Sequence, residues 1–182
     1  KQDIFMRLDG LCGPDVVLAS NTSGLAASEI ARNMVHPERM VIAHFWNPAP
    51  LVPLVEIVRG PKTSDDTVEK TRRLLLRMNK KPIEVKKEIP GFVGNRLQFA
   101  LLREALYLLE QGVASKEDID AAVTYSIGRR LPVTGPFLSA DMGGLDVYAS
   151  ICGYLFPELS NAGEPSPALM KLVAEGKYGQ KS

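Results

Sequence analysis

The chain has 182 residues with 22 basic and 21 acidic side chains, and 45% of its residues are hydrophobic. These proportions are typical of a folded globular protein and exclude a disordered or collagen-like chain. Because the formal net charge is only +1, the sequence lacks the basic excess of nucleic-acid and anionic-membrane binders, and we expect a small-molecule partner.

Cys12 and Cys152 are too few and too far apart for a disulfide framework or a metal cluster, so we expect a reducing compartment and no metal. No apolar run approaches the length that crosses a membrane, and the first residues form neither a signal peptide nor a transit peptide. The sequence therefore predicts a cytoplasmic protein without membrane contact.

The first half of the chain predicts alternating helices and strands. The expected elements are a helix over 2–11, a strand over 15–21, a helix over 26–34, strands over 40–46 and 54–58, a helix over 64–78 with Ser64 as its cap, and a strand over 82–85. Their order contains β-α-β units, which place parallel strands side by side. We expect half of a doubly wound sheet.

The strands over 40–46 and 54–58 each carry one ionisable side chain in an apolar run, His44 and Glu56. Their proline-rich connection is too short for a helical crossover, so we predict antiparallel neighbours in which the two side chains face each other. An unpaired buried carboxylate costs on the order of several kcal/mol, and an imidazole would satisfy it. The pair would make His44 a general base. The alternative is a core histidine beside a carboxylate that points to water from an edge strand.

Other polar positions follow strands or begin helices. Ser23 lies directly after a strand, where open α/β sheets bind ligands, although a turn or helix cap is the commoner role of serine. Asn95 begins a long helix and could hold a carbonyl oxygen or serve as a cap. Arg129 and Arg130 could bind a carboxylate or phosphate, or form a solvated pair.

A charged and then Pro-Gly stretch over 86–91 predicts a boundary between a domain at 1–88 and a helical domain at 89–182. The longest predicted helix, 93–111, has two apolar faces, which indicates burial in a bundle or between two subunits. The remaining expected elements are a helix over 116–125 capped by Ser115, a Gly/Pro/Arg loop over 128–136, and helices over 145–155 and 167–175.

Spaced motifs run through nearly the whole chain. They are Ser20-Asn21-Thr22-Ser23, His44-Phe45-Trp46-Asn47-Pro48, Leu54-Val55-Glu56, Pro90-Gly91-Phe92-Val93-Gly94-Asn95-Arg96, Ala114 to Asp120, Gly135-Pro136-Phe137 and Gly144-Leu145-Asp146. Together they strongly resemble the L-3-hydroxyacyl-CoA dehydrogenase family. The resemblance implies an α/β Rossmann-type domain, entered in its second half and with a mixed sheet, followed by an all-α helical domain that carries much of the dimer interface.

The resemblance also implies residue roles. His44 matches the catalytic base that takes the proton of the 3-hydroxyl group while hydride leaves C3 for the nicotinamide of NAD. Glu56 matches the carboxylate that orients this histidine. Ser23 matches a residue that contacts the substrate oxygen and the nicotinamide end of the cofactor, and Asn95 matches an amide near the reacting group.

Asn21, Ser23 and Asn47 are the residues expected to bind NAD. We expect oxidation of an L-3-hydroxyacyl-CoA to the 3-ketoacyl-CoA, as in fatty-acid or butanoate metabolism, by a homodimer formed through the helical domain. The Gly-rich phosphate loop and the acidic ribose ligand of the family are expected upstream of these residues.

The basic loop over 128–136 resembles L-gulonate 3-dehydrogenase, carnitine dehydrogenase and lambda-crystallin more than the acyl-CoA enzymes. One alternative is therefore a dehydrogenase of a small 3-hydroxy acid, with Arg129 and Arg130 as carboxylate ligands. A second alternative is a catalytically idle structural protein of the lambda-crystallin type. The end of the chain, from Ser166 to Gly179, resembles the acyl-CoA enzymes and favours the acyl-CoA substrate.

Overall fold

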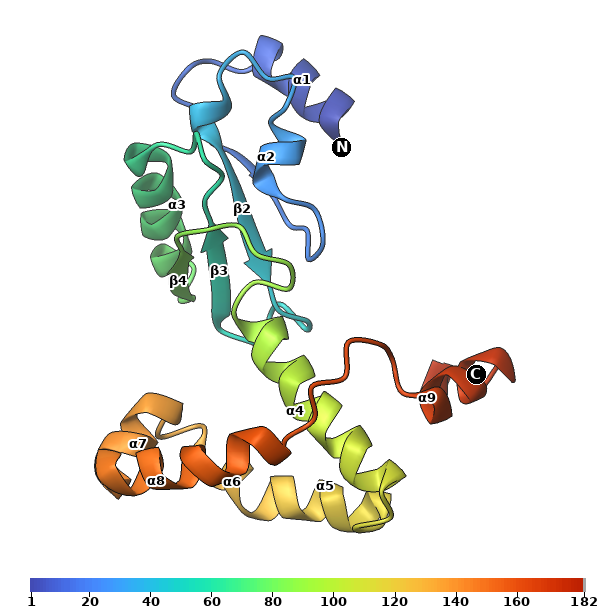
Figure 1. Ribbon diagram of the computed structural model, residues 1–182. Helices are drawn as coiled ribbons and strands as arrows, with labels where there is room; N and C mark the ends of the chain where they lie inside the picture. Colours follow the sequence, from blue (N-terminus) through green and yellow to red (C-terminus); the bar gives the residue numbers. More distant parts are fainter. Residues whose placement is uncertain (182) are drawn as a thin grey trace. The chain divides into compact units, whose positions relative to one another are not determined.

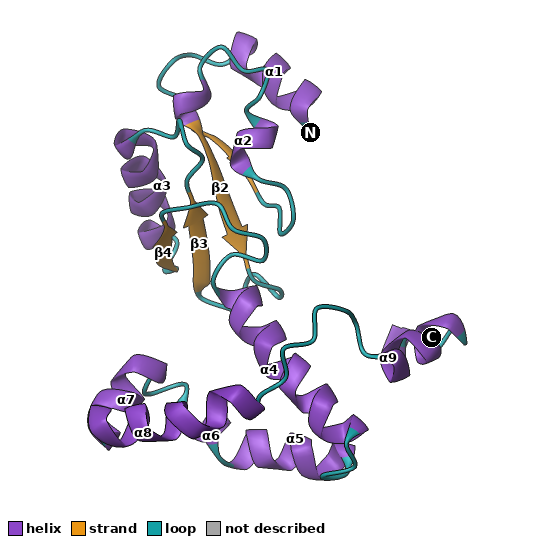
Figure 2. Cartoon of the chain, viewed as in Figure 1, coloured by secondary structure: helices purple, strands orange, loops and turns teal. Residues whose placement is uncertain are grey.

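A computed structural model of the chain describes residues 1–181, apart from the side chain of Lys181. The chain divides into two compact units, Lys1–Leu97 and Gln98–Ser182, which we describe separately. Strands occur in the first unit, and the described part of the second is built from helices (Figure 2). The division falls inside a helix that begins at Gly94, beyond the boundary that we predict after residue 88.

The first unit is built around a mixed sheet of four strands in the order β1-β2-β3-β4. Its elements are α1 (Gln2–Leu11), β1 (Leu18–Ser20), α2 (Ala27–Ile30), η1 (Pro37–Arg39), β2 (Met40–Phe45), β3 (Leu54–Val58), α3 (Asp65–Arg77) and β4 (Lys81–Val85). The pairs β1–β2 and β3–β4 are parallel, whereas β2 and β3 are antiparallel. The antiparallel pair predicted from the short connection is confirmed.

Helices cover both faces of this sheet, with α3 on one side and α1 and α2 on the other (Figure 1). Side chains alternate between the faces along each strand. Ile42 and Val58 are buried on the face of α1 and α2, and Val41 and Ile57 are buried on the face of α3. His44 and Glu56 continue the rows of Ile42 and Val58, so both lie on the face that α1 and α2 cover.

A buried ion pair anchors α1 to the segment before β2. The Arg39 guanidinium donates to Asp9 Oδ1, with Nη2 at 2.7 Å and Nε at 3.0 Å, and both residues are buried. Asp9 Oδ2 accepts the backbone N–H groups of Val35 at 2.6 Å and His36 at 3.0 Å. Burial acts to raise the pKa of Asp9, but the hydrogen bonds from His36, Arg39 and Val35 outweigh it and lower that pKa below its ordinary value.

Two predicted elements of the first unit are shorter than the sequence suggests. The strand expected over 15–21 is confined to β1, because its partner β2 begins at Met40, opposite Leu18, and earlier residues have no ladder to join. The helix expected over 26–34 ends at Ile30. After Ile30 the N–H groups of Arg32 and Met34 donate to the carbonyls of Glu29 at 3.4 Å and Ala31 at 3.0 Å, three residues earlier, so the chain continues as turns instead of an α-helix.

The second unit continues α4 (Gly94–Glu110) into further helices. These are α5 (Lys116–Tyr125), α6 (Ile127–Arg130), α7 (Pro136–Gly143), α8 (Leu145–Leu155), η2 (Phe156–Glu158), α9 (Pro167–Ala174) and η3 (Gly179–Lys181). The prediction of a loop over 128–136 is wrong at both ends, because α6 occupies its start and α7 begins at Pro136. Proline suits a first helical turn, where its missing N–H would have no partner.

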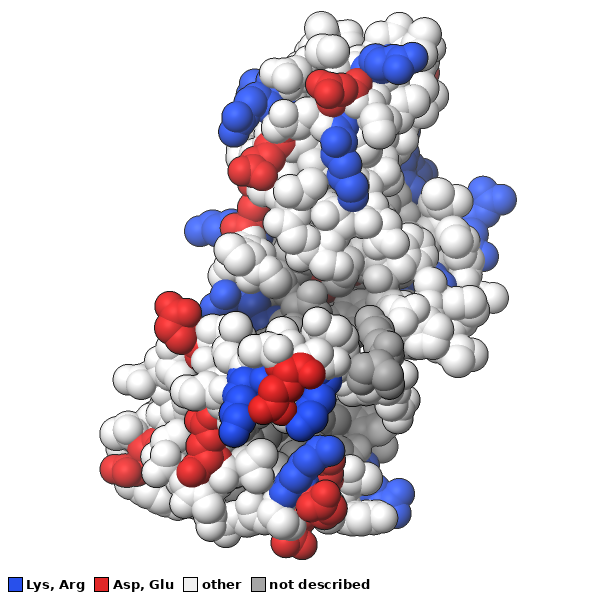
Figure 3. Space-filling model, turned by 90° about the vertical axis from the view of Figure 1, so that its right-hand side faces the viewer, with Lys and Arg blue, Asp and Glu red and all other residues white. Residues whose placement is uncertain are grey.

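The second unit leaves much of its apolar surface uncovered. Within residues 98–181, Ile119 is the one buried apolar side chain, and Phe99 and Leu102 of α4 are 58% and 42% exposed. Basic and acidic groups are interspersed among uncharged ones on the face drawn in Figure 3. None of the helices in the described part of the chain combines the length and hydropathy needed to cross a bilayer.

Candidate active site

His44 and Glu56 face each other across the antiparallel strands β2 and β3. His44 Nδ1 lies 2.7 Å from Glu56 Oε2, and the carboxylate is 0% exposed. Because β3 pairs with β4 on its other side, Glu56 is not on an edge strand. The alternative of a carboxylate that points to water is therefore wrong.

Four hydrogen-bond donors surround the Glu56 carboxylate. Its Oε1 accepts the backbone N–H groups of Val93 at 2.9 Å and Gly94 at 3.0 Å. Its Oε2 accepts His44 Nδ1–H and, at 3.3 Å, the indole N–H of Trp46. Burial acts to raise the pKa of Glu56, but the hydrogen bonds from Gly94, His44, Val93 and Trp46 outweigh it and lower that pKa. Glu56 is therefore a carboxylate at neutral pH.

The carboxylate determines which nitrogen of His44 carries the proton. An ionised carboxylate only accepts hydrogen bonds, so Nδ1 is the protonated nitrogen and Nε2 of the neutral ring is the acceptor. Ser23 Oγ lies 2.8 Å from Nε2 and donates to it. The ring of Phe92 packs edge-on against the imidazole, with the centroids 5.4 Å apart. The arrangement leaves one basic nitrogen directed toward the loop that follows β1.

Ser23 does not act as a helix cap. The N-cap of α2 is Ala26, which makes no side-chain capping bond. The neighbouring Thr22 takes the local turn role, because its Oγ1 accepts the N–H of Leu25 at 3.3 Å. The Ser23 hydroxyl is thereby left to contact His44.

The three asparagines of the predicted site differ in their contacts. Asn21 Oδ1 accepts the Phe45 N–H at 3.1 Å, which joins the loop after β1 to the end of β2 and leaves the Asn21 amide N–H groups as donors. Asn47 is exposed just beyond β2. Asn95 is half-buried and is the second residue of α4 rather than its cap. Within residues 1–181, neither Asn47 nor Asn95 makes a side-chain hydrogen bond to His44, Glu56 or another residue.

Sequence reasoning missed the donors that Trp46, Val93 and Gly94 provide to Glu56. The available signal was Gly94 itself, since glycine is needed where a backbone closely approaches another group. A Cβ on Gly94 would lie 2.2 Å from Cζ2 of the Trp46 ring, so only glycine brings this backbone to the carboxylate. Phe92, with a positive φ of 49°, turns the chain just before this approach.

A cavity of about 210 Å³ adjoins Ser23. Its lining is mainly apolar and comes from Ser23, Gly24, Leu25, Ala26, Glu88, Ile89, Pro90, Gly91 and Phe92. Glu88 is engaged by Ser28, whose N–H and hydroxyl lie 2.5 and 2.6 Å from its two oxygens. The cavity therefore offers an apolar space with the Ser23 hydroxyl at its margin.

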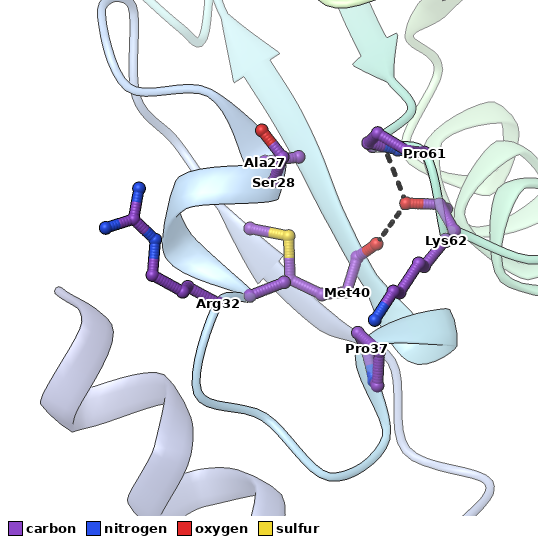
Figure 4. A pocket seen from close by; sticks show the side chains of 10 residues that line it. Ala27, Ser28, Arg32, Pro37, Met40, Pro61 and Lys62 are labelled. Carbon is purple, nitrogen blue, oxygen red and sulfur yellow. Dashed lines mark hydrogen bonds between the residues drawn. The ribbon is translucent and has the colours of Figure 1, made fainter.

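A second cavity, of about 110 Å³, lies at the other end of β2, between α2, η1 and the turn after β3 (Figure 4). Thr63 Oγ1 closes that turn, because it accepts the Gly60 N–H at 2.9 Å and donates to the Met40 carbonyl at 2.7 Å. Met40 and His44 are about 13 Å apart along the strand at ~3.3 Å per residue. This cavity is therefore separate from the His44 site.

Comparison with known proteins identifies the family to which the chain belongs. Residues 1–89 match the family model of the 3-hydroxyacyl-CoA dehydrogenase NAD binding domain, and residues 91–182 match the model of the C-terminal domain. The chain belongs to the 3-hydroxyacyl-CoA dehydrogenase family. The predicted family, NAD as its cofactor, and the α/β domain followed by a helical domain are confirmed.

Family members with different substrates are similar to the chain. It is 41% identical to 5-formyl-3-hydroxy-2-methylpyridine 4-carboxylate 5-dehydrogenase of Mesorhizobium japonicum, covering 100% of this chain and 59% of that protein. It is 39% identical to 3-hydroxybutyryl-CoA dehydrogenase of Clostridioides difficile, covering 100% of this chain and 64% of that protein. A crystal structure of a 5-formyl-3-hydroxy-2-methylpyridine 4-carboxylic acid 5-dehydrogenase, described as an NAD⁺-dependent dismutase, superposes with a TM-score of 0.95 at 40% identity, over 100% of this chain and 59% of that one. The chain thus spans about three fifths of these relatives.

The residues present fit the nicotinamide end of NAD. The parallel strands β1 and β2 end at the same edge of the sheet, where dinucleotides bind in such folds. Asn21 and Asn47 supply amide groups there, and Ser23 supplies a hydroxyl beside the cavity. The 182 residues contain no G-x-G-x-x-G turn.

Proposed function

We propose that the chain provides the proton-transfer centre of an NAD-dependent dehydrogenase that oxidises L-3-hydroxyacyl-CoA to 3-ketoacyl-CoA. The hydrogen-bonded chain Ser23–His44–Glu56 supports this proposal most strongly. It joins a basic nitrogen near the carboxyl ends of parallel strands to a carboxylate that is fully buried and saturated with donors. A histidine with only a packing role would need no such support.

His44 would accept the hydroxyl proton of the substrate at Nε2. The substrate hydroxyl would replace the Ser23 hydroxyl as the donor to this nitrogen, and Ser23 could then donate to the substrate oxygen. NAD, when bound, supplies the acceptor for the hydride that leaves the same carbon. Loss of the O–H proton to His44 and of the hydride to the cofactor together leaves a carbonyl group on the substrate.

Glu56 would stabilise the imidazolium that forms on His44. Its charge lies 2.7 Å from Nδ1, and the two backbone donors on Oε1 hold its orientation. General-base catalysis of this kind typically contributes roughly 10²- to 10⁴-fold to a rate. We further propose that Asn95 acts as an amide near the reacting group, and that Asn21 and Asn47 contact the nicotinamide end.

We propose a cofactor domain at 1–88 and a helical domain at 89–182 that forms a homodimer. The exposed apolar side chains of the second unit, such as Phe99 and Leu102, support this because a monomer rarely leaves a large contiguous apolar surface in water.

A small carboxylate substrate is the second candidate. The chain is 41% identical over its whole length to one enzyme named for a pyridine carboxylate, and it superposes on a structure of such an enzyme with a TM-score of 0.95. Arg129 and Arg130 on α6 are exposed and form no ion pair within residues 1–181, so both guanidinium groups are available to a carboxylate. The complete Ser23–His44–Glu56 chain argues against an idle structural protein of the lambda-crystallin type.

The test is a substrate series with the full-length protein and NAD, followed by NADH formation. The series contains L-3-hydroxybutyryl-CoA, a longer L-3-hydroxyacyl-CoA, the D enantiomer, L-carnitine, L-gulonate and 5-formyl-3-hydroxy-2-methylpyridine 4-carboxylate. We expect the highest kcat/KM with an L-3-hydroxyacyl-CoA and little turnover of the D enantiomer.

A higher kcat/KM with one of the small carboxylates would replace the acyl-CoA proposal by the second candidate. In that case Arg129→Gln should raise KM for the carboxylate with a smaller change in kcat. Absence of turnover with all compounds, in a folded protein that binds NAD, would count against both the acyl-CoA and the small-carboxylate candidates. His44→Gln serves as the control that any activity belongs to this site.

A further inference from the structure

We propose that Trp46 is a positioning residue that tunes the His44–Glu56 pair through its indole N–H. This N–H shares Glu56 Oε2 with His44 Nδ1–H, and so limits how strongly Glu56 attracts the proton on the imidazole. The inference rests on the proposed function only for the statement that His44 is the base. Trp46 would act on His44 through Glu56.

Trp46 reaches the site from the end of β2, two residues after His44. Its Nε1 lies 3.3 Å from Glu56 Oε2, the same oxygen that His44 Nδ1 approaches at 2.7 Å. The indole and imidazole centroids are 6.2 Å apart, with the rings inclined at 60°. Two N–H groups therefore converge on one carboxylate oxygen from neighbouring rings.

The indole ring also sets the distance of α4 from the carboxylate. Cζ2, Cε2 and Cη2 of Trp46 would lie 2.2, 3.0 and 3.2 Å from a Cβ on Gly94. The ring and the Gly94 backbone are thus packed directly together, and the Gly94 N–H reaches Glu56 Oε1. Trp46 therefore acts on both oxygens, directly on Oε2 and through packing on Oε1.

Two hydrogen bonds to the same carboxylate oxygen weaken each other, because both donors are attracted by the same negative charge. Removing the indole N–H leaves Oε2 with a single donor and makes it a better partner for a charged imidazolium. We therefore expect His44 to take up its proton at a higher pH when Trp46 is replaced by phenylalanine, which keeps an aromatic ring but lacks the N–H.

Glu56 is the one ionisable side chain in hydrogen-bonding contact with His44 among residues 1–97, and Ser23, Trp46 and Phe92 around the ring are uncharged. Charged groups of the neighbouring segments are directed elsewhere. Glu88 accepts from Ser28, Lys1 Nζ donates to Ser20 Oγ at 3.4 Å, and Arg96 donates to the Pro90 carbonyl at 3.5 Å. Removal of the indole N–H should therefore act on His44 through Glu56.

The test is an NMR titration of the 182-residue chain, without NAD or substrate. The chain has two histidines, and the second, His36, is exposed and pairs with Glu38, so it is an internal control. In Trp46→Phe, the midpoint of the His44 ring signals should rise on the order of half a pH unit, with that of His36 unchanged. The Val93 and Gly94 amide signals show whether the remaining donors still hold Glu56.

A second measurement uses the unmodified chain, so it does not depend on the folding of a variant. The indole N–H signal of Trp46, the single tryptophan, should exchange slowly with water and should shift over the pH range in which His44 titrates. An unchanged or lower His44 midpoint in Trp46→Phe, with both amides intact, would overturn the proposal. The proposal would also be overturned if the indole N–H exchanged rapidly with water and its signal did not shift over the pH range in which His44 titrates.

These outcomes are independent of the proposed reaction. If the full-length protein shows no dehydrogenase activity but the His44 midpoint rises in Trp46→Phe, the proposed function fails and the role of Trp46 stands. If the protein is an active dehydrogenase but the midpoint does not rise, the role of Trp46 fails alone.

Discussion

The backbone N–H of Gly94 donates to Glu56 Oε1 at 3.0 Å, although 38 residues separate the two in the sequence. This bond joins the first turn of α4 to the middle of β3. The positive end of the helix therefore faces the carboxylate, which favours the ionised form. The Glu56 carboxylate, the partner of His44, thus receives hydrogen bonds from a segment outside the strands that carry the pair.

We expect His44 and Glu56 to act as one unit in the full-length enzyme. His44→Gln should lower kcat by roughly 10²- to 10⁴-fold, because the general base is lost. Glu56→Gln should also lower kcat, since a neutral amide neither fixes the tautomer nor stabilises the imidazolium, and cofactor affinity should change less. Steady-state kinetics of both variants, with NAD binding measured separately, checks this.

The double variant distinguishes a shared role from two separate roles. If both side chains serve the same proton transfer, the double variant should be little worse than His44→Gln alone. A loss equal to the product of the two single losses would mean that Glu56 acts in another step.

Gly94→Ala should be destabilising, because the added Cβ would meet the Trp46 ring at 2.2 Å. Overpacking of this kind typically costs about 1–3 kcal/mol. The first turn of α4 should also move from Glu56, so kcat should fall along with the free energy of unfolding. Chemical denaturation and steady-state kinetics measure the two effects.

Trp46→Phe provides the matched background, because the smaller ring lacks the Cζ2 atom that the new Cβ would strike. The cost of Gly94→Ala should be smaller there than in the unmodified protein. Gly10→Ala is the control: Gly10 lies in α1 with no atom within 4 Å of an added Cβ. Equal costs for Gly94→Ala in both backgrounds would contradict the packing argument.

Asp9→Asn should destabilise the protein by about 3–5 kcal/mol, because Arg39 would remain buried without a countercharge. Urea denaturation at neutral pH measures the loss. Asp15→Asn is the comparison: Asp15 is exposed and its nearest ion-pair partner, Lys70, is 3.9 Å away. Its effect should stay within roughly 0.5 kcal/mol. Similar losses for the two variants would show that the Asp9–Arg39 pair adds little.

The pH dependence of unfolding should follow from Asp9 and Glu56, whose pKa values are both lowered in the folded protein. The unfolded state then binds protons more readily, so their contribution is fully present above the unfolded values, about 4. It is lost as the pH falls through the lower folded values. Stability should therefore drop below about pH 4, and less steeply in Asp9→Asn. An equal slope in that variant would contradict this assignment.

Self-association should involve the helical part of the chain. Phe99→Glu on α4 should weaken it, since a charge at an apolar interface loses hydration without gaining a partner. Light scattering across a concentration series gives the mass. Leu74→Glu, at a residue of α3 with the same 58% exposure, should leave the mass unchanged. A folded monomer at high micromolar concentration would contradict the expected homodimer.

Local patterns in the sequence were sufficient for the strands that carry the reactive pair. The bounds of β3 and α5 agree with prediction, and the short proline-rich connection before Leu54 allows only an antiparallel pair. Given that pairing, His44 and Glu56 must lie on the same face. Ser64 caps α3 as predicted, because its hydroxyl accepts the Thr67 N–H at 3.1 Å. These features depend on groups close together in the chain.

Only the tertiary structure decided how the Glu56 carboxylate is satisfied and what Ser23 does. No periodicity indicates that Gly94 and Trp46 converge on Glu56, because this contact depends on where a helix begins in space rather than on its pattern. Ser23 has the sequence signature of a cap, but the packing of β1 beside β2 brings its hydroxyl to His44 instead. Hydrogen bonds between distant segments are set by the three-dimensional fold, and local sequence carries little trace of them.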